Sequence, residues 1–164
     1  MRSHRGVVQS QPKVVKYIPS MLQGATRQIA IDRPPQTDKE LWFLVRALWG
    51  ITIPHTQVCD GHSTPFQAFA DAYFARYPVM IWKGSRGFAG KSWNLANLAN
   101  TMAVMLKAQV TILGGSGAQS INVHKASSSA WAYENAPRDL LVQAPTKMDT
   151  ELTNGAWIRS LLAS

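Results

Sequence analysis

A glycine-rich loop that leads into a helix carries the clearest chemistry in this sequence. The loop begins at Gly84 and ends in Gly90-Lys91-Ser92. In loops of this type the backbone N–H groups and the helix N-terminus point at bound phosphates, the lysine reaches the β- and γ-phosphates, and the serine hydroxyl is available to Mg²⁺. We therefore interpret residues 84–92 as a P-loop (Walker A motif), which predicts ATP and Mg²⁺ as ligands.

The loop departs from the strict pattern G-x-x-x-x-G-K-[ST], which requires glycine where this chain has Ser85. An alternative interpretation is a glycine-rich turn that only joins a strand to a helix. The order of an apolar strand, the Gly-Lys-Ser triplet and a long following helix favours the P-loop. The residues expected to bind nucleotide are Gln67, Gly84, Ser85, Arg86, Gly87, Phe88, Ala89, Gly90, Lys91 and Ser92, of which Lys91 and Arg86 are the catalytic candidates and Ser92 the metal ligand.

Arg86 and Gln67 are the two less specific members of this set. A guanidinium inside the loop favours a role in binding γ-phosphate oxygens through paired hydrogen bonds, or in reporting the nucleotide state to a neighbour; the alternative is a solvated loop arginine. The Gln67 carboxamide lies on the helix that precedes the loop, and it could pair with the donor and acceptor edge of adenine. A lone glutamine is nevertheless more often a surface residue.

Other groups of reactive residues are less convincing. His55, Cys59 and His62 lie in one loop, but three candidate ligands without a fourth nearby fall short of a structural zinc site. His124 is expected to be a structural residue of a helix. The six tryptophans are scattered through expected elements, which favours core packing over a base-stacking surface.

Hydrophobic spacing predicts an α/β fold with a parallel sheet flanked by helices. Thr37-Asp38-Lys39-Glu40 has the pattern of a capping box that opens the first helix. Thr64-Pro65 has the pattern of an N-cap followed by a first-turn proline. The expected helices are 37–49, 65–77, 91–107 and 118–133, and the expected strands are 79–82, 110–113, 150–153 and 157–162, the last two joined by an Asn154-Gly155 turn.

Composition and charge limit the class of protein. With 164 residues, 46% hydrophobic content and one cysteine, the chain predicts one soluble, intracellular domain without a disulfide framework. No apolar run approaches the roughly 20 residues that a membrane-spanning helix needs. Residues 1–36 hold six of the 17 basic residues and one of the nine acidic ones. This basic arm suits binding to DNA, or it is a solvated and flexible leader.

The order of these motifs resembles the N-terminal ATPase of tailed-phage terminase large subunits, in particular those of actinobacterial phages. The resemblance covers residues 38–164 and rests on Pro65-Phe66-Gln67, on Trp82-Lys83-Gly84 through Ser92, on Val110-Thr111-Ile112-Leu113-Gly114-Gly115-Ser116 and on Asn154-Gly155-Ala156-Trp157-Ile158. It implies that Gln67 recognises adenine, that Lys91 and Ser92 bind phosphate and Mg²⁺, and that Arg86 is the loop arginine. It also implies a motor that packages double-stranded DNA into the procapsid.

The resemblance further implies a set of partners and a location. Proteins of this family bind the portal protein and the terminase small subunit, and they form a homo-oligomer on the portal. They act in the cytoplasm of an infected or lysogenic bacterial host, without a membrane partner.

The sequence also departs from that family. Its members continue to a strand that ends in Asp-Glu (Walker B), where the aspartate supports Mg²⁺ and the glutamate activates water, and then to a nuclease domain. After Ser92 the acidic residues are Glu134, Asp139, Asp149 and Glu151, and none ends an apolar strand. Residues 37–164 therefore correspond to the front part of the ATPase domain, truncated before Walker B and without the nuclease. We expect a free apolar edge on its incomplete sheet.

From this departure we expect a chain that binds ATP but hydrolyses it poorly. The alternatives are a nucleotide- or DNA-binding module without hydrolysis and a fragment of another P-loop DNA translocase.

Overall fold

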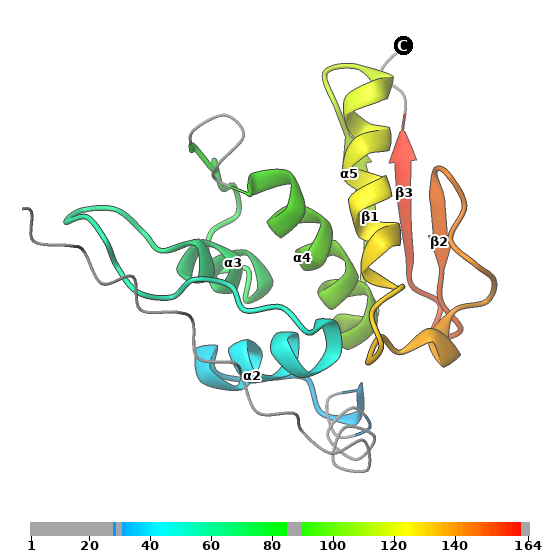
Figure 1. Cartoon of the computed structure of the whole chain (residues 1–164), viewed down its shortest axis with the longest axis horizontal. Helices are drawn as coiled ribbons and strands as arrows, with labels where there is room; N and C mark the ends of the chain where they lie inside the picture. Colours follow the sequence, from blue (N-terminus) through cyan, green and yellow to red (C-terminus); the bar gives the residue numbers. More distant parts are fainter. Residues whose placement is uncertain (1–27, 29–30, 85–89, 162–164) are drawn as a thin grey trace, which may run out of the picture.

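A computed structural model describes residue 28 and residues 31–84 and 90–161, and these form a mixed α/β structure. Helices α2, α3 and α4 lie on one side, and α5 covers a small sheet on the other (Figure 1). The helices are α2 (Asp38–Trp49), α3 (Pro65–Tyr73), α4 (Lys91–Leu106) and α5 (Gly117–Ala130), the strands are β1 (Gln109–Leu113), β2 (Asp149–Glu151) and β3 (Trp157–Leu161), and a 3₁₀ turn spans Arg138–Leu140. The α/β class expected from the sequence is confirmed.

The sheet has three strands in the order β1-β3-β2. Strand β1 pairs in parallel with β3, from Gln109 opposite Trp157 to Leu113 opposite Leu161. Strands β2 and β3 form the antiparallel hairpin that the Asn154-Gly155 turn predicts, and Gly155 adopts φ +86° there. The expected parallel sheet is therefore mixed. Within the described residues, one edge of β1 has no neighbouring strand.

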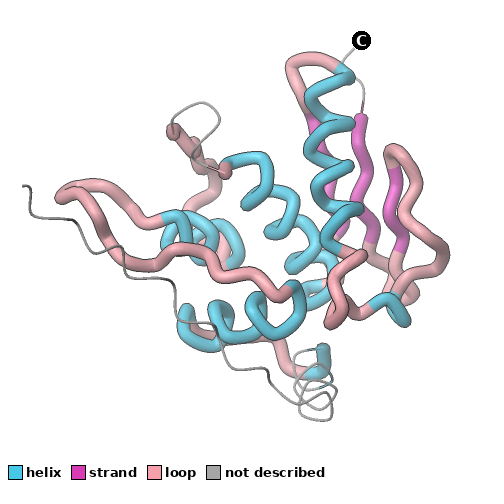
Figure 2. The backbone as a smooth tube through the Cα atoms, viewed as in Figure 1, coloured by secondary structure: helices cyan, strands magenta, loops and turns pink. Residues whose placement is uncertain are grey.

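The expected strand at residues 79–82 is wrong. These residues have no strand structure, and Val79 and Ile81 are 78% and 89% exposed. A strand requires a hydrogen-bonded neighbour, and β1 pairs only with β3 in the described sheet. Figure 2 shows the described part of the segment between α3 and α4 as loop. Trp82 is partly buried and packs against the core instead.

Local signals set the helix ends. Thr37 Oγ1 accepts a hydrogen bond from the Glu40 backbone N–H, and Glu40 accepts in return from the Thr37 N–H, which confirms the predicted capping box. Gly50 ends α2 in the left-handed conformation. Helix α3 ends earlier than expected, at Tyr73, because Ala75 takes a left-handed φ of 49°.

The C-terminal part differs from the prediction in small ways. Helix α5 ends at Ala130, before the expected position at residue 133. Residues 140–142, which read as an apolar segment, form the end of the 3₁₀ turn and a single bridge between Leu141 and Leu152. None of the helices in the described part of the chain is long and apolar enough to cross a membrane.

Helix α4 lies at the centre of the structure and contacts α3, α5, β1 and β3. Because it is enclosed on several sides, even its polar residues Asn97, Asn100 and Thr101 are buried. Asn100 Oδ1 accepts hydrogen bonds from Ser127 Oγ at 2.6 Å and from Trp131 Nε1 at 3.2 Å. Asn100 Nδ2 donates to the Ser127 carbonyl oxygen at 3.0 Å, so this one side chain ties α4 to α5.

Two of the six tryptophans, Trp49 and Trp131, are buried in the same interior as the sequence predicted, whereas Trp93 is exposed. Trp49 of α2 donates to Thr101 Oγ1 at 3.1 Å. Its ring meets Trp131 edge to face, with centroids 5.2 Å apart. We refer to Asn100, Thr101, Ser127, Trp49 and Trp131 as the polar seam of α4.

Replacing Asn100 by alanine should lower the free energy of unfolding by on the order of 3 kcal/mol. The change leaves the Ser127 hydroxyl, the Ser127 carbonyl and the Trp131 indole N–H buried without their partner. Urea denaturation followed by circular dichroism measures the loss. Asn122→Ala on the exposed face of α5 is the matched control and should cost less than 0.5 kcal/mol. Equal stability of the two variants would contradict the role of the seam.

His124 should make stability depend on pH. Its ring is buried between α5 and β2, with Nε2 3.3 Å from Thr150 Oγ1 and Nδ1 3.4 Å from Ser128 Oγ. Burial lowers the pKa of His124 below its ordinary value of 6.5, while backbone contacts and the charge of Asp149 act in the opposite direction. The unfolded chain therefore binds a proton that the folded chain resists, and stability falls as the pH drops below 6.5.

Urea denaturation at pH 7.5, 6.5 and 5.5 measures this dependence. His124→Gln should flatten the profile, because it removes a contribution of up to about 1.4 kcal/mol per pH unit. His62→Gln, in an exposed loop, should keep the wild-type slope. A His124→Gln profile as steep as that of the wild type would show that another group causes the pH dependence.

Candidate functional site

A hydrogen bond joins Gly84 and Lys91, the described residues at the beginning and near the end of the predicted motif. Lys91 Nζ donates a hydrogen bond to the carbonyl oxygen of Gly84 at 2.8 Å. This bond therefore holds the ammonium group of Lys91 beside Gly84, where the predicted motif begins. Five predicted site residues lie outside the described residues, and their roles stay predictions; these are Ser85, Arg86, Gly87, Phe88 and Ala89.

Helix α4 begins directly after the loop, with Gly90 as its N-cap. Gly90 adopts φ +56°, which an L side chain rarely tolerates, although a Cβ there would meet no atom closer than 3.9 Å. The backbone conformation at position 90, and not a lack of space for a side chain, therefore requires glycine. The N-cap provides no side-chain hydrogen bond to the first turn of α4. The start of this helix favours a negatively charged group through its N–H groups and its dipole.

A pocket of about 350 Å³ opens beside Lys91. It lies between the start of α3 and the segment that precedes the loop, and its lining residues are His62, Ser63, Thr64, Pro65, Ala68, Asp71, Met80, Ile81, Trp82, Lys83, Gly84, Lys91 and Asn94. This volume is at the lower end of the range for small-molecule sites, roughly 300–1,000 Å³. The fold thus brings α3 and the end of the loop together, although they are separate in the sequence.

Asn94 lines this pocket with an unsatisfied atom. The residue is 7% exposed, and its Oδ1 is buried without a hydrogen-bond partner among the described residues. A buried acceptor without a partner is costly. A bound molecule that presents an N–H or O–H group would remove this cost, so the pocket has features of a binding site beyond its shape.

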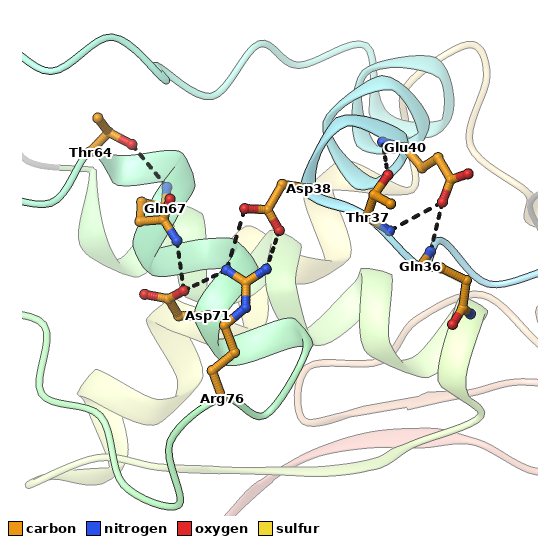
Figure 3. A network of polar contacts seen from close by, with 8 residues as sticks. All are labelled: Gln36, Thr37, Asp38, Glu40, Thr64, Gln67, Asp71 and Arg76. Carbon is orange, nitrogen blue, oxygen red and sulfur yellow. Dashed lines mark hydrogen bonds and ion pairs between the residues drawn. The ribbon is translucent and has the colours of Figure 1, made fainter.

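Gln67 lies beside the pocket and does not line it directly. Its amide nitrogen donates to Asp71 Oδ1 at 2.7 Å, and Asp71 does line the pocket. Asp71 also accepts from Arg76 Nη1 at 2.7 Å. Arg76 in turn forms an ion pair with Asp38 at the start of α2, and these two carboxylates, Asp38 first, raise the pKa of its guanidinium (Figure 3).

Ser92 faces a different hollow from Lys91. It is exposed and lines a space of about 430 Å³ at the carboxyl end of β1, together with Leu113, Gly114, Gly115, Gln119, Asn122 and Val123. Gly114 is tightly enclosed there, since a Cβ would lie 2.6 Å from the Ser120 nitrogen. No carboxylate lines this space in the described residues. A ligand in contact with both Lys91 and Ser92 must therefore extend across the first turn of α4.

The donor set fits a polyphosphate better than a metal cluster. Lys83, Lys91 and the start of α4 provide positive charge and N–H donors on one side of the pocket. The described residues contain no group of three or more His, Cys, Asp or Glu side chains that could hold a metal ion. Mg²⁺ in nucleotide sites is usually held by one or two carboxylates together with phosphate oxygens, and no carboxylate lines the hollow beside Ser92 in the described residues. The role of Ser92 as a metal ligand therefore stays a prediction.

Sequence analysis missed Asp71, Arg76 and Asn94 as residues of this region. Asp71 follows Gln67 by four positions, a spacing that places two side chains on the same face of a helix and is a readable signal. Arg76 is 38 residues from its partner Asp38, and no local pattern indicates that pair. Asn94 reads as an ordinary polar helix residue until the helix around it is seen to be buried.

Comparison with protein-family models, with curated proteins and with solved structures finds no match to this chain.

Replacement of Gly90 by alanine should lower the free energy of unfolding by about 1 kcal/mol. An alanine at this positive φ carries the penalty of the left-handed conformation. Gly90→Asn should cost less, because asparagine tolerates this conformation. Urea denaturation of both variants measures the difference. An alanine variant as stable as the wild type would show that the start of α4 adapts without strain.

Proposed function

We propose that this chain binds ATP at the start of α4 and is the N-terminal ATPase segment of a terminase large subunit of the tailed-phage type. The observation that carries the proposal is the hydrogen bond from Lys91, at the start of α4, to the Gly84 carbonyl oxygen. The lysine, the positive-φ glycine and the helix N-terminus lie together beside a pocket. A turn that only connected two elements would not need this combination.

In this proposal each residue has a defined task. The Lys91 ammonium has three N–H donors, so it can hold the Gly84 carbonyl and bind a phosphate oxygen at the same time. The first-turn N–H groups of α4 bind further phosphate oxygens, and Ser92 contributes its hydroxyl to Mg²⁺. Gln67 contacts the adenine base. ATP with Mg²⁺ supplies the transferable phosphoryl group when bound.

Poor hydrolysis remains part of the proposal. Asp71 is the one carboxylate that lines the pocket in the described part of the chain, and it already accepts hydrogen bonds from Gln67 and Arg76. At the sheet, Asp149 and Glu151 both pair with Arg159 at 3.0 Å. Attack by water needs a group that orients or activates it. These pairings favour the second candidate, a module that binds nucleotide without hydrolysis.

The packaging role rests on the resemblance of the motif order. The partners in this role are double-stranded DNA, the portal protein and the terminase small subunit. The chain would act as part of a homo-oligomer on the portal, in the cytoplasm of the bacterial host. The basic arm, residues 1–36, is proposed to contact DNA, and most of it lies outside the described residues. A fragment of another P-loop DNA translocase would share the same nucleotide site.

Replacing Lys91 by alanine should weaken ATP binding about tenfold or more, because it removes a charge-assisted contact to phosphate. Isothermal titration with ATP and Mg²⁺ measures the dissociation constant. Lys125→Ala, which removes an exposed lysine from α5, is the control for net charge and should bind like the wild type. Equal binding by the wild type and the Lys91 variant would refute the proposed site.

Phosphate release, measured on the same samples, separates the two candidate functions. ATP binding without phosphate release favours the non-hydrolysing module or a segment that needs a further polypeptide. Robust phosphate release that Lys91→Ala abolishes would contradict the expectation of poor hydrolysis and identify a complete ATPase.

A further inference from the structure

The Asp71 carboxylate joins the pocket to a hydrogen-bonded cluster on α3. Its side chain is only 14% exposed, and one of its oxygens, Oδ1, accepts from both Gln67 Nε2 and Arg76 Nη1 at 2.7 Å. Asp38 of α2 holds Arg76 from the opposite side. Figure 3 shows Gln67, Asp71, Arg76 and Asp38 in this order. The carboxylate is therefore fixed from two directions.

This contact determines which way the Gln67 amide points. An ionised carboxylate only accepts hydrogen bonds, so the NH₂ end of the amide must face Asp71 and the carbonyl end must face away. The backbone of Gln67 is also held, because its N–H donates to Thr64 Oγ1 at 3.0 Å. Within the described residues, Gln67 Oε1 has no hydrogen-bond partner. The carbonyl and the second N–H of the amide thus stay available, and because Gln67 does not line the pocket itself, they would meet a part of the ligand that extends past Asp71.

A donor and an acceptor side by side distinguish two kinds of purine. Adenine presents an amino donor at position 6 next to the N7 acceptor, which complements the amide carbonyl and N–H. A purine with an oxo group at position 6 presents two acceptors, O6 and N7, and leaves the Gln67 carbonyl without a donor. A freely rotating amide would discriminate less well, because it can turn its N–H groups toward O6 of a 6-oxo purine.

We propose that Asp71 is a positioning residue that orients the Gln67 amide to select 6-amino over 6-oxo purine nucleotides. Arg76, held by Asp38, keeps the carboxylate in place and offsets its negative charge beside a pocket for phosphate. The selection rests on the proposed function, since it requires that a purine nucleotide binds at the start of α4.

The orientation of the amide is measurable without nucleotide. In ¹⁵N-labelled protein, the Gln67 side-chain amide, assigned through its loss in Gln67→Leu, should show two well-separated proton shifts and slow solvent exchange. In Asp71→Leu these shifts should move to the values of a free glutamine. Free-glutamine shifts in the wild type would overturn the inference, whether or not the variant folds.

Selectivity is measured as the ratio of the dissociation constants for ITP and ATP. We expect a ratio of about ten or more for the wild type and of about two or less for Asp71→Leu and Gln67→Leu. Asp71→Asn keeps an acceptor oxygen and should retain most of the preference. Asp38→Asn weakens the pair with Arg76 but keeps the bonds that Asp71 accepts from Gln67 and Arg76, so it should lower stability and retain most of the preference.

The outcomes separate this inference from the proposed function. A wild type that binds neither nucleotide overturns both. A wild type that prefers ATP, with a ratio that Asp71→Leu does not change, overturns the positioning role and leaves ATP binding intact. An equal loss of affinity for both nucleotides in Asp71→Leu would assign Asp71 a purely structural role.

Discussion

The three hydrogen bonds of Asn100 are the constraint on which the rest of the structure depends. A polar group in a low-dielectric interior is costly unless it is satisfied, so α4 and α5 are held where Asn100 meets Ser127 and Trp131. Apolar contacts alone would tolerate small shifts between these helices. The Trp49–Thr101 bond extends the same constraint to α2. Lys91 is the first residue of α4, so the polar seam, by fixing the position of α4, also fixes the position of Lys91.

The candidate site lies where the parts held by this seam meet. The pocket beside Lys91 belongs to the α3 and α4 side, whereas the hollow beside Ser92 belongs to the carboxyl end of β1. Two successive residues of one helix thus face two parts of the fold. A polyphosphate that touches both would bridge the helical side and the sheet side, and its binding would depend on how rigidly α4 is held between them.

Local signals in the sequence predicted much of the fold. The features that depend on contacts between distant residues could not be predicted in this way. The Thr37–Glu40 capping box and the Asn154-Gly155 turn were readable because each signal acts within a few residues. The strand predicted at the apolar run 79–82 was wrong, because a strand depends on a neighbouring strand that the run itself does not encode. Asn94, Asn97 and Asn100 are polar residues whose burial no local pattern in the sequence indicates. For the site, two residues of the predicted motif, Lys91 and Gly84, are in contact, and the role of the motif stays a prediction. The contacts among Asp71, Arg76 and Asp38 could be identified only from the tertiary structure.

The pairing of β1 with β3 has a consequence for the order of folding. Gln109 and Trp157 are neighbours in the sheet, although α5, the 3₁₀ turn and β2 separate them in the chain. The β2–β3 hairpin closes over a few residues, so its loop costs little entropy and it can form early. The parallel pair requires a long loop to close first and is slower to form. We expect β3 to enter the sheet as half of a preformed hairpin, with β1 joining once α5 has packed against α4.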